Sequence, residues 1–525
     1  RGLPEKNIKN ITLENITITA DNGLIASDAH AIKLNNVNIT PRQGPVMSLQ
    51  DCRNVTIQGS GTQIDCDTFL LLKGEKTGNI RLIDNDLSNV NHEVIMEKEV
   101  PAGAVLITQD KMIDEAGISD SFELENLNVL TGNTSTLLLD YLLQELDKHY
   151  DTRRKTIEQA LISREKLLEY QQELRQKYHK LLGKLPEKTP LNACVTGVIE
   201  CDGYRIEKVA YESRPNHHVT ANLYVPTTGN APFPGILVPC GHWKNAKTIE
   251  EHQSICSLLA TNGMVALVVD PISQGERYQL LTADGKPANR GGTLSHSLLD
   301  IGANLVGTDI VAYEAWDNIR GIDYLVSRQE VDPEKIGCTG ASGGGTQTTF
   351  LMALDDRIKA AAPACYICSV ESNLKDLGSP DGCQQLAGGN ALGIEQISYL
   401  TMRAPKPTLI IAAEQDFFPI SATRETFKEA QRVYTALGFP DRVAMFTVDA
   451  EHGFNKAMRE AAVNWMRRWL LKNDRPITEP EFTLHEEKNL WVTTTGQVGS
   501  HFPNEVNIAD LNLARAVELA QQRQR

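Results

Sequence analysis

The sequence predicts an α/β protein in which a mostly parallel, doubly wound sheet follows a short stack of β repeats. Three observations carry this prediction. Short apolar runs alternate with helix-like segments from about residue 190 onward, an internal repeat occupies residues 1–95, and a Gly-x-Ser-x-Gly pentapeptide at residues 340–344 links an apolar run to a helix-like segment. Short apolar strands separated by helices are typical of parallel sheets that are covered on both faces. In such sheets the chemistry lies at the carboxyl ends of the strands.

The repeat fills residues 1–95. A segment that begins Asn10-Ile-Thr-Leu returns as Ala31-Ile-Lys-Leu, Asn54-Val-Thr-Ile and Asn79-Ile-Arg-Leu. The equivalent apolar positions recur at intervals of 21, 23 and 25 residues and are Ile11, Ile32, Val55 and Ile80. Two short strands per repeat, rich in β-branched residues and with asparagine at the turns, indicate coils that stack on one another. We therefore predict a partial, non-catalytic, right-handed parallel β-helix.

Three further segments follow the repeat. Residues 96–135 lose the period and become acidic, with Gly, Asn and Ser, which indicates a connector. Residues 136–182 have the apolar spacing of amphipathic helices, and Gly183 ends the pattern. These helices open the α/β domain, which we place at residues 136–475. Residues 476–525 are expected to form a C-terminal extension, with a final helix, that packs on this domain.

Composition excludes several classes of function. The net charge of −15 argues against a nucleic-acid partner, because phosphate binding needs a clustered basic surface. The sequence holds no run of about 18 apolar residues, so we predict no membrane span. The first residues have no apolar run typical of a signal peptide.

Ten cysteines in 525 residues do not make a disulfide-dense scaffold. Three pairs nevertheless have spacings that suit a disulfide: Cys52 with Cys66, Cys194 with Cys201, and Cys368 with Cys383. The Cys-x-x-Cys pattern at residues 365–368 has no second such pair and no clustered histidines beside it. We therefore expect no metal and no cofactor.

Ser342 is the predicted nucleophile. It stands at the centre of the pentapeptide Gly340-Ala-Ser-Gly-Gly344, which has the pattern of a nucleophile elbow between a strand and a helix. A hydroxyl is a weak nucleophile at neutral pH and must be held on a sharp turn beside a base. The glycines allow that turn.

A base and an acid follow Ser342 in the chain. His452 comes directly after an apolar run at residues 443–448, and we predict that it is the general base. Asp416 follows the apolar run at residues 408–412 and is the preferred acid for orienting the histidine, with Glu414 as the alternative. The order Ser342, Asp416, His452 is the order described for α/β-hydrolases.

The oxyanion formed by attack on a carbonyl needs donors that already point at it. We expect the N–H of Gly343 and a second N–H from the loop Pro239-Cys-Gly-His-Trp, with His242 preferred and Trp243 as the neighbouring alternative. The ring of Trp243 is a candidate contact for a sugar, or else a core residue. Arg277 is a candidate partner for a uronate carboxylate, or else part of a structural ion pair.

Residues from about 160 to 525 resemble the α/β-hydrolase carbohydrate esterases. The resemblance rests on the motifs Pro239-Cys-Gly-His-Trp, Asp270-Pro-Ile-Ser-Gln-Gly-Glu-Arg, Gly340-Ala-Ser-Gly-Gly, Glu414-Gln-Asp and Glu451-His-Gly-Phe. It implies an α/β-hydrolase catalytic domain with ester-cleaving chemistry. Acetylxylan-esterase-like members often have His-Gly-Tyr where this chain has Cys240-Gly-His, a departure from the pattern of ordinary deacetylases. Residues 1–95 in turn resemble the last coils of polygalacturonase-type glycoside hydrolases.

The two resemblances together are most similar to pectin methylesterases of gut bacteria that act on rhamnogalacturonan-type pectin. They imply that Ser342 attacks the methyl ester of a galacturonate in a pectic oligosaccharide and that methanol is released. An acetyl esterase, a serine peptidase of the same fold and a catalytically silent carbohydrate-binding protein are the alternatives. A pectic substrate implies a periplasmic or secreted enzyme.

Overall fold

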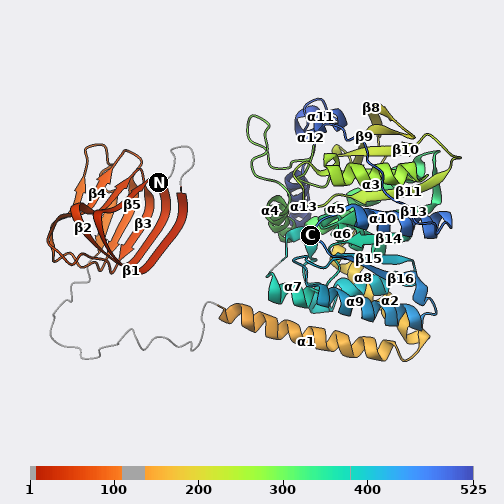
Figure 1. The fold of residues 1–525 in the computed structure, drawn as a ribbon, viewed down its shortest axis with the longest axis horizontal. Coiled ribbons are helices and arrows are strands. Elements are labelled where there is room, and N and C mark those ends of the chain that lie inside the picture. Colours follow the sequence, from red (N-terminus) through yellow and green to blue (C-terminus); the bar gives the residue numbers. More distant parts are fainter. Residues whose placement is uncertain (1–7, 109–135, 379, 524–525) are drawn as a thin grey trace. The chain divides into compact units, whose positions relative to one another are not determined.

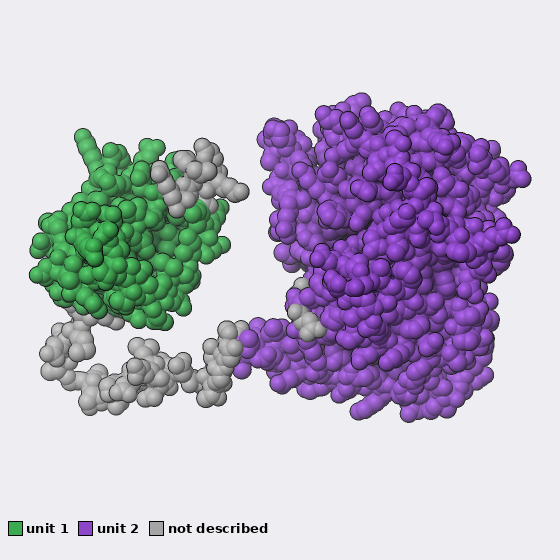
Figure 2. Space-filling model, viewed as in Figure 1, with its two compact units in different colours: residues 1–129 green, residues 130–525 purple. Residues whose placement is uncertain are grey.

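The computed structural model describes residues 8–108, 136–378 and 380–523. The chain divides into two compact units, one within residues 1–129 and the other within residues 130–525 (Figure 2). Unit 1 has an apolar core of its own, and unit 2 has separate apolar cores on the two faces of its sheet. No helix in the described ranges is both long enough and apolar enough to cross a bilayer.

Unit 1 is built from strands that pair in parallel throughout its described part (Figure 1). The strands are β1 (Ile8–Ser27), β2 (Ala29–Gln50), β3 (Arg53–Gln58), β4 (Cys66–Lys73), β5 (Gly78–Ile83), β6 (Val90–Met96) and β7 (Val105–Thr108). The repeat positions Ile11, Ile32, Val55 and Ile80 are register partners in successive pairs. Repeats therefore lie directly beside one another.

Asparagines recur at equivalent positions within these strands. Asn36, Asn54 and Asn79 all have positive φ, a region that asparagine tolerates better than most residues. Their side chains bond from one repeat to the next: Asn36 donates to Asn15 at 2.9 Å, and Asn79 donates to Asn54 at 2.6 Å. We expected these asparagines at turns, but they lie within strands, where they connect neighbouring repeats.

The strands of unit 1 extend beyond the predicted boundary at residue 95. Strand β7 pairs in parallel with β5, and Ile80 is the register partner of Val105. The start of the predicted connector at residue 96 is therefore wrong. Pro101 and Gly103 interrupt the apolar pattern and obscure this short strand. The rest of the connector, residues 109–135, lies outside the described residues.

Unit 2 begins with two helices. The predicted helical segment divides into α1 (Leu137–Ala160) and α2 (Arg164–Leu182). Ser163 caps α2 by accepting a hydrogen bond from the Lys166 N–H at 3.3 Å, and this cap separates the two helices. Gly183 follows α2 with φ 73°, as expected for the glycine that ends the pattern.

The sheet of unit 2 has nine strands in the order β16-β15-β14-β13-β11-β12-β10-β9-β8 (Figure 1). The strands are β8 (Cys194–Cys201), β9 (Tyr204–Arg214), β10 (His217–Pro226), β11 (Phe233–Pro239), β12 (Val265–Val269), β13 (Val331–Ala341), β14 (Ile358–Ala364), β15 (Thr408–Ala413) and β16 (Val443–Val448). Pairs from β12 to β16 are parallel, and β8, β9 and β10 form an antiparallel edge that joins β12.

Helices cover both faces of this sheet. Alternate strand residues such as Leu237 and Ile236 belong to different apolar cores, because successive side chains of a strand point to opposite faces. One core includes α2, α5 (Ile310–Ser327), α6 (Gly343–Leu354), α8 (Gln396–Arg403) and α9 (Ile420–Ala436). The other includes α3 (Glu250–Thr261) and α10 (Lys456–Met466). The sheet is doubly wound, as predicted.

Shorter helices and a C-terminal segment complete unit 2. The helices are α4 (Thr293–Leu305), α7 (Val370–Asp376), α11 (Glu487–Leu490), α12 (Val498–His501) and α13 (Ile508–Arg523). Buried Glu276 accepts hydrogen bonds from the N–H groups of Val492 and Thr493 at 2.8 and 2.7 Å. These bonds fasten the C-terminal segment to the loop that follows β12.

All ten cysteines are free thiols. None of the three pairs with suitable spacing is bonded, so the suggested disulfides are not present. Cys368 instead donates to the Pro419 carbonyl, and Cys383 contacts His242. Spacing in the sequence did not predict bonding in space, because Cys368 and Cys383 each contact another partner.

Candidate active site

Ser342 sits on a strained turn between β13 and α6. Its backbone has φ 58° and ψ −124°, a conformation that a non-glycine residue rarely adopts. The Ser342 N–H donates to the Ala364 carbonyl at 2.9 Å, and the Ser342 carbonyl accepts from the Thr346 N–H at 2.9 Å. The turn is thus held from both sides at the carboxyl end of a central strand, which is the arrangement of a nucleophile elbow.

The glycines of the elbow are required by close packing. A Cβ on Gly344 would lie 2.3 Å from the Pro239 carbonyl oxygen, and a Cβ on Gly340 would lie 2.5 Å from the same atom. Both distances are far shorter than van der Waals contact, and the obstructing atom is a backbone oxygen. Gly340 and Gly344 are therefore required by the last residue of β11, Pro239, which lies directly against the turn.

His452 and Asp416 are brought together by the loops after β16 and β15. Nδ1 of His452 is 2.8 Å from Oδ1 of Asp416, and the Asp416 side chain is only 3% exposed. Asp416 Oδ1 also accepts the Phe418 N–H at 3.1 Å, which fixes the carboxylate. The alternative acid, Glu414, pairs with Arg424 at 2.6 Å and does not contact His452. The geometry suits a carboxylate that orients an imidazole and stabilises its protonated form.

The histidine loop is anchored by two groups that the sequence did not single out for this purpose. Cys365 donates from Sγ to the Gly453 carbonyl at 3.3 Å, and burial raises the pKa of its thiol to about 12, so it stays protonated. Glu251 accepts the Phe454 N–H at 3.2 Å from α3. Both hold the residues that follow His452 in place.

The N–H of Gly343, which follows Ser342 in the chain, and the N–H of His242 or Trp243, which line the same cavity as Ser342, are the candidate oxyanion donors. Gly343 is the first residue of α6. The first N–H groups of a helix have no partner within the helix, and the positive end of the helix dipole lies there. The Trp243 N–H donates to the Gly241 carbonyl at 2.8 Å, whereas the His242 N–H has no protein acceptor in the described part of the chain. The pair Gly343 and His242 is therefore better placed for this role than Gly343 and Trp243.

The ring of His242 lies against Gly343. A Cβ at Gly343 would come within 2.7 to 2.9 Å of three atoms of that ring. Burial, followed by His296 and His452, lowers the pKa of His242 to about 3, so its imidazole is neutral at ordinary pH. A neutral ring adds no positive charge that would disfavour protonation of His452.

Ser342 and His452 line the same cavity, which has a volume of about 440 Å³. Its wall combines aromatic rings with a few polar groups, as ligand sites commonly do. The aromatic residues are Trp243, Phe417 and Phe418, and the acidic ones are Glu251 and Asp381. Trp243 is 53% exposed, so the structure places it at the rim and not in the core.

Arg277 is not at this cavity, which corrects the prediction that it contacts substrate. It is 1% exposed, and its guanidinium pairs with Asp317 at 2.7 Å. The same group donates to the carbonyls of His218 and Asp270 at 2.9 and 3.0 Å. The structural ion pair is the alternative that the structure bears out. Its place in the loop that follows β12 suggested the strand end, but the side chain turns into the protein.

Two sequence-family models match parts of unit 2. The acetyl xylan esterase family matches residues 187–374, a range that includes Ser342. The prolyl oligopeptidase family matches residues 286–473, a range that includes Ser342, Asp416 and His452. Each match covers about a third of the chain.

Individual proteins are similar over longer stretches. The putative hydrolase YtaP of Bacillus subtilis (strain 168) is 24% identical over 314 residues, which make up 57% of this chain and 99% of that protein. The solved structure of methylesterase BT1017 has a TM-score of 0.55 and 23% identity, and the match covers 72% of this chain and 81% of that one. A putative acetyl xylan esterase from Bacteroides fragilis NCTC 9343 has a TM-score of 0.45 and 17% identity, covering 55% and 76%.

The two family matches and the likeness to methylesterase BT1017 support one conclusion about the fold. Unit 2 has the α/β-hydrolase fold.

Proposed function

We propose that this protein is a serine carbohydrate esterase that removes acetyl groups from a saccharide through an acyl-enzyme on Ser342. The observation that carries the proposal is the His452–Asp416 pair, 2.8 Å apart, in the same cavity as a serine on a strained elbow. The match of residues 187–374 to the acetyl xylan esterase family supports an ester as substrate and acetyl as its acyl group.

Each residue of the site has a separate role in the proposed reaction. Oγ of Ser342 attacks the ester carbonyl while Nε2 of His452 takes the hydroxyl proton. Asp416 holds the proton on Nδ1 of His452 and stabilises the imidazolium that forms. The N–H groups of Gly343 and His242 bind the oxyanion. His452 then gives the proton to the departing sugar oxygen, which leaves as a hydroxyl, and a water molecule activated by the same imidazole hydrolyses the acyl-enzyme and releases acetate.

The charge of the cavity supports a neutral sugar next to the ester. Among the described lining residues there is no Arg or Lys, while Glu251 and Asp381 add acidic groups. A chain of free uronates would bring carboxylates toward these groups without a cation to pair them. Trp243 and Phe417, each 53% exposed, offer apolar faces for a neutral saccharide ring.

The methyl ester of a galacturonate is the second candidate. It is favoured by unit 1, whose parallel-paired repeats and asparagines bonded from repeat to repeat support our assignment of this unit to the end of a right-handed parallel β-helix. Such a unit would connect the enzyme with pectic polymers. In this reaction the uronyl group would be transferred to Ser342 and methanol would leave. A periplasmic or secreted location goes with either saccharide.

Parallel release of acetate and methanol distinguishes the two esters. The substrate is a pectic oligosaccharide that carries both acetyl and methyl esters, compared with acetylated xylan oligosaccharides. Wild type and Ser342→Ala are assayed side by side, with Ser369→Ala as a matched control because Ser369 only caps α7. Acetate release that disappears only in Ser342→Ala is the expected result.

Other outcomes contradict the proposal at defined points. Methanol without acetate would transfer the assignment to the uronate methyl ester. Acetate release that persists in Ser342→Ala would remove Ser342 as the nucleophile. If neither product forms, we would test a panel of short peptides, because the match of residues 286–473 to the prolyl oligopeptidase family makes a peptidase the next hypothesis.

A further inference from the structure

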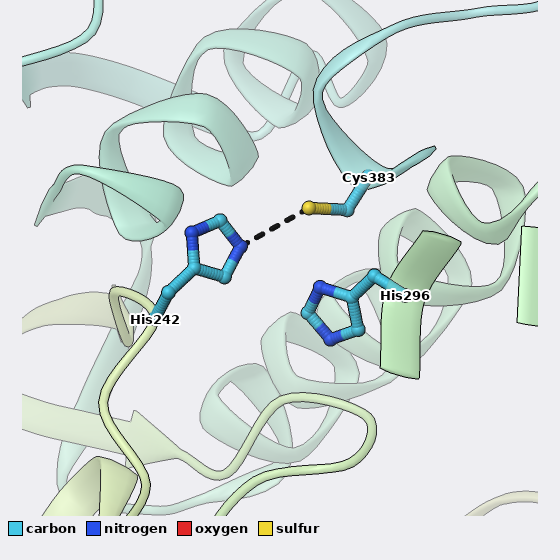
Figure 3. Close-up of side chains that lie close together, drawn as sticks. All are labelled: His242, His296 and Cys383. Carbon is cyan, nitrogen blue, oxygen red and sulfur yellow. Dashed lines mark hydrogen bonds between the residues drawn. The ribbon is translucent and has the colours of Figure 1, made fainter. Parts of the chain in front are cut away.

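Three potential metal ligands meet beside the elbow, from segments far apart in the sequence. His242 comes from the loop after β11, His296 from α4 and Cys383 from the turn at Gly382–Gln384 (Figure 3). Their ligand atoms all lie within 4.8 Å of one another. Nε2 of His242 is 3.1 Å from Sγ of Cys383, and the rings of His242 and His296 meet edge to face with centroids 5.3 Å apart.

His296 is oriented as a metal-binding histidine would be. It is 1% exposed, and its Nε2 is 2.6 Å from the Ile272 carbonyl, which can only accept a proton. The hydrogen is therefore on Nε2, and Nδ1 carries the lone pair. Among the described residues, this buried Nδ1 has no hydrogen-bond partner. Figure 3 shows that it faces the space toward His242 and Cys383.

A backbone carbonyl on the second ring nitrogen is the usual support for a metal-ligating histidine. An unpartnered nitrogen in a buried site is costly when no ligand satisfies it. The reaction assigned to Ser342 uses neither His296 nor the Cys383 thiol.

We propose that Nε2 of His242, Nδ1 of His296 and Sγ of Cys383 form a binding site for one zinc ion. Two imidazoles and a thiolate are a ligand set that zinc accepts, with a fourth position left for water. Bond lengths of about 2.0 Å to nitrogen and about 2.3 Å to sulfur require ligand atoms roughly 3.3 to 3.8 Å apart. The His242–Cys383 pair, now 3.1 Å apart, would open slightly, and His296, whose ligand atom lies within 4.8 Å of the other two, would move inward by up to about 1 Å. On binding, the Cys383 thiol releases its proton to solvent and the thiolate takes the metal.

This inference goes beyond the esterase activity and reverses the expectation of no metal that came from the cysteine spacing. Zinc here would connect the loop that carries the His242 N–H with α4 and with the turn at Gly382–Gln384. The site would therefore stabilise the region next to Ser342. It does not supply a group to the ester reaction.

A second group of potential ligands, Cys365, Asp416 and His452, also lies within 4.8 Å. It contains the proposed acid and base pair, so a metal there would compete with catalysis. The experiment must therefore distinguish the two groups, which it can do because each contains one cysteine.

Cobalt titration of the full chain is the test. Chelator-treated protein receives Co²⁺, which reports thiolate ligation by a charge-transfer band in the near ultraviolet, and Zn²⁺ is then added as a competitor. The variants are Cys383→Ser and His296→Gln. The controls are Cys365→Ser, from the second group, and Cys256→Ser, a buried thiol outside both groups. Circular dichroism and thermal unfolding establish that each variant folds.

We expect one Co²⁺ per chain with a thiolate band, displaced by Zn²⁺, in wild type and both controls. Cys383→Ser should lose the band, and both site variants should weaken binding by at least about 100-fold, beyond the usual cost of losing an outer-shell partner. Absence of the band in wild type, or its loss in Cys365→Ser with retention in Cys383→Ser, would overturn the proposal. If the site variants do not fold, zinc X-ray absorption of wild type decides: one sulfur and two nitrogens are expected, and oxygen and nitrogen alone would refute it.

Discussion

Replacing Asp416 by asparagine should nearly abolish turnover without unfolding the protein. Asparagine keeps the shape but removes the negative charge beside Nδ1 of His452, 2.8 Å away in wild type. An imidazolium and a carboxylate with charge centres about 4 Å apart attract by about 4 kcal/mol at an effective dielectric constant of 20. This corresponds to about a thousandfold in rate at 1.36 kcal/mol per factor of ten. Loss of the correct tautomer brings the expected decrease in kcat to roughly 10⁴-fold, as in other serine hydrolases.

The assay is the steady-state hydrolysis of p-nitrophenyl acetate, with kcat and KM measured from pH 5 to 9. Glu414→Gln is the matched control, because Glu414 pairs with Arg424 and does not contact His452. We expect that Glu414→Gln changes kcat less than about twofold, as is usual when an exposed ion pair is lost. The reasoning is refuted if Asp416→Asn retains more than a tenth of wild-type kcat, or if Glu414→Gln loses as much.

Three further substitutions test the roles of individual residues outside the catalytic pair. Gly344→Ala should lower kcat and cost roughly 1–3 kcal/mol of unfolding free energy, because its Cβ would lie 2.3 Å from the Pro239 carbonyl oxygen; unchanged kcat and melting temperature would contradict this. Burial raises the pKa of Asp309 to about 7, so wild type should lose up to ~4 kcal/mol of stability as pH rises from about 4 to 7, when the unfolded chain releases a proton that the folded chain keeps. Asp309→Asn keeps an acceptor and should remove that part of the slope in urea unfolding; an equal slope in both proteins would contradict it. Arg277→Gln should cost about 3–5 kcal/mol by leaving the Asp317 carboxylate buried without its arginine, with KM of the folded enzyme unchanged; a several-fold higher KM at full stability would restore Arg277 to the substrate site.

The parallel part of the hydrolase sheet could be predicted because its strands are short apolar runs with turn residues at both ends. Antiparallel strands β8, β9 and β10 were not predicted; in β9, for example, the charged residues Glu207 and Lys208 interrupt the apolar pattern. Strand β7 was missed because it has only four residues and follows Pro101 and Gly103. Length and alternation are weak signals in such segments.

Some residues of the candidate site could be predicted from the sequence and others could not. Ser342, Asp416 and His452 each follow a predicted strand, and the common edge of a parallel sheet brings such residues together. Arg277 also follows a strand, yet a buried carboxylate on α5, Asp317, takes its guanidinium. That outcome depends on packing between distant segments. His296 and Cys383 could not be connected from the sequence for the same reason.

Labelling with a fluorophosphonate determines whether Ser342 is an activated nucleophile, because this reagent reacts with a serine only when a base and an oxyanion hole activate it. The labelled protein is digested, the adduct is mapped by mass spectrometry, and residual acetate release is measured on the same samples. Our account predicts a single adduct on Ser342, activity lost in proportion to labelling, and no adduct in Asp416→Asn on the same time scale. An adduct on another residue, or full activity after complete labelling of Ser342, would contradict it.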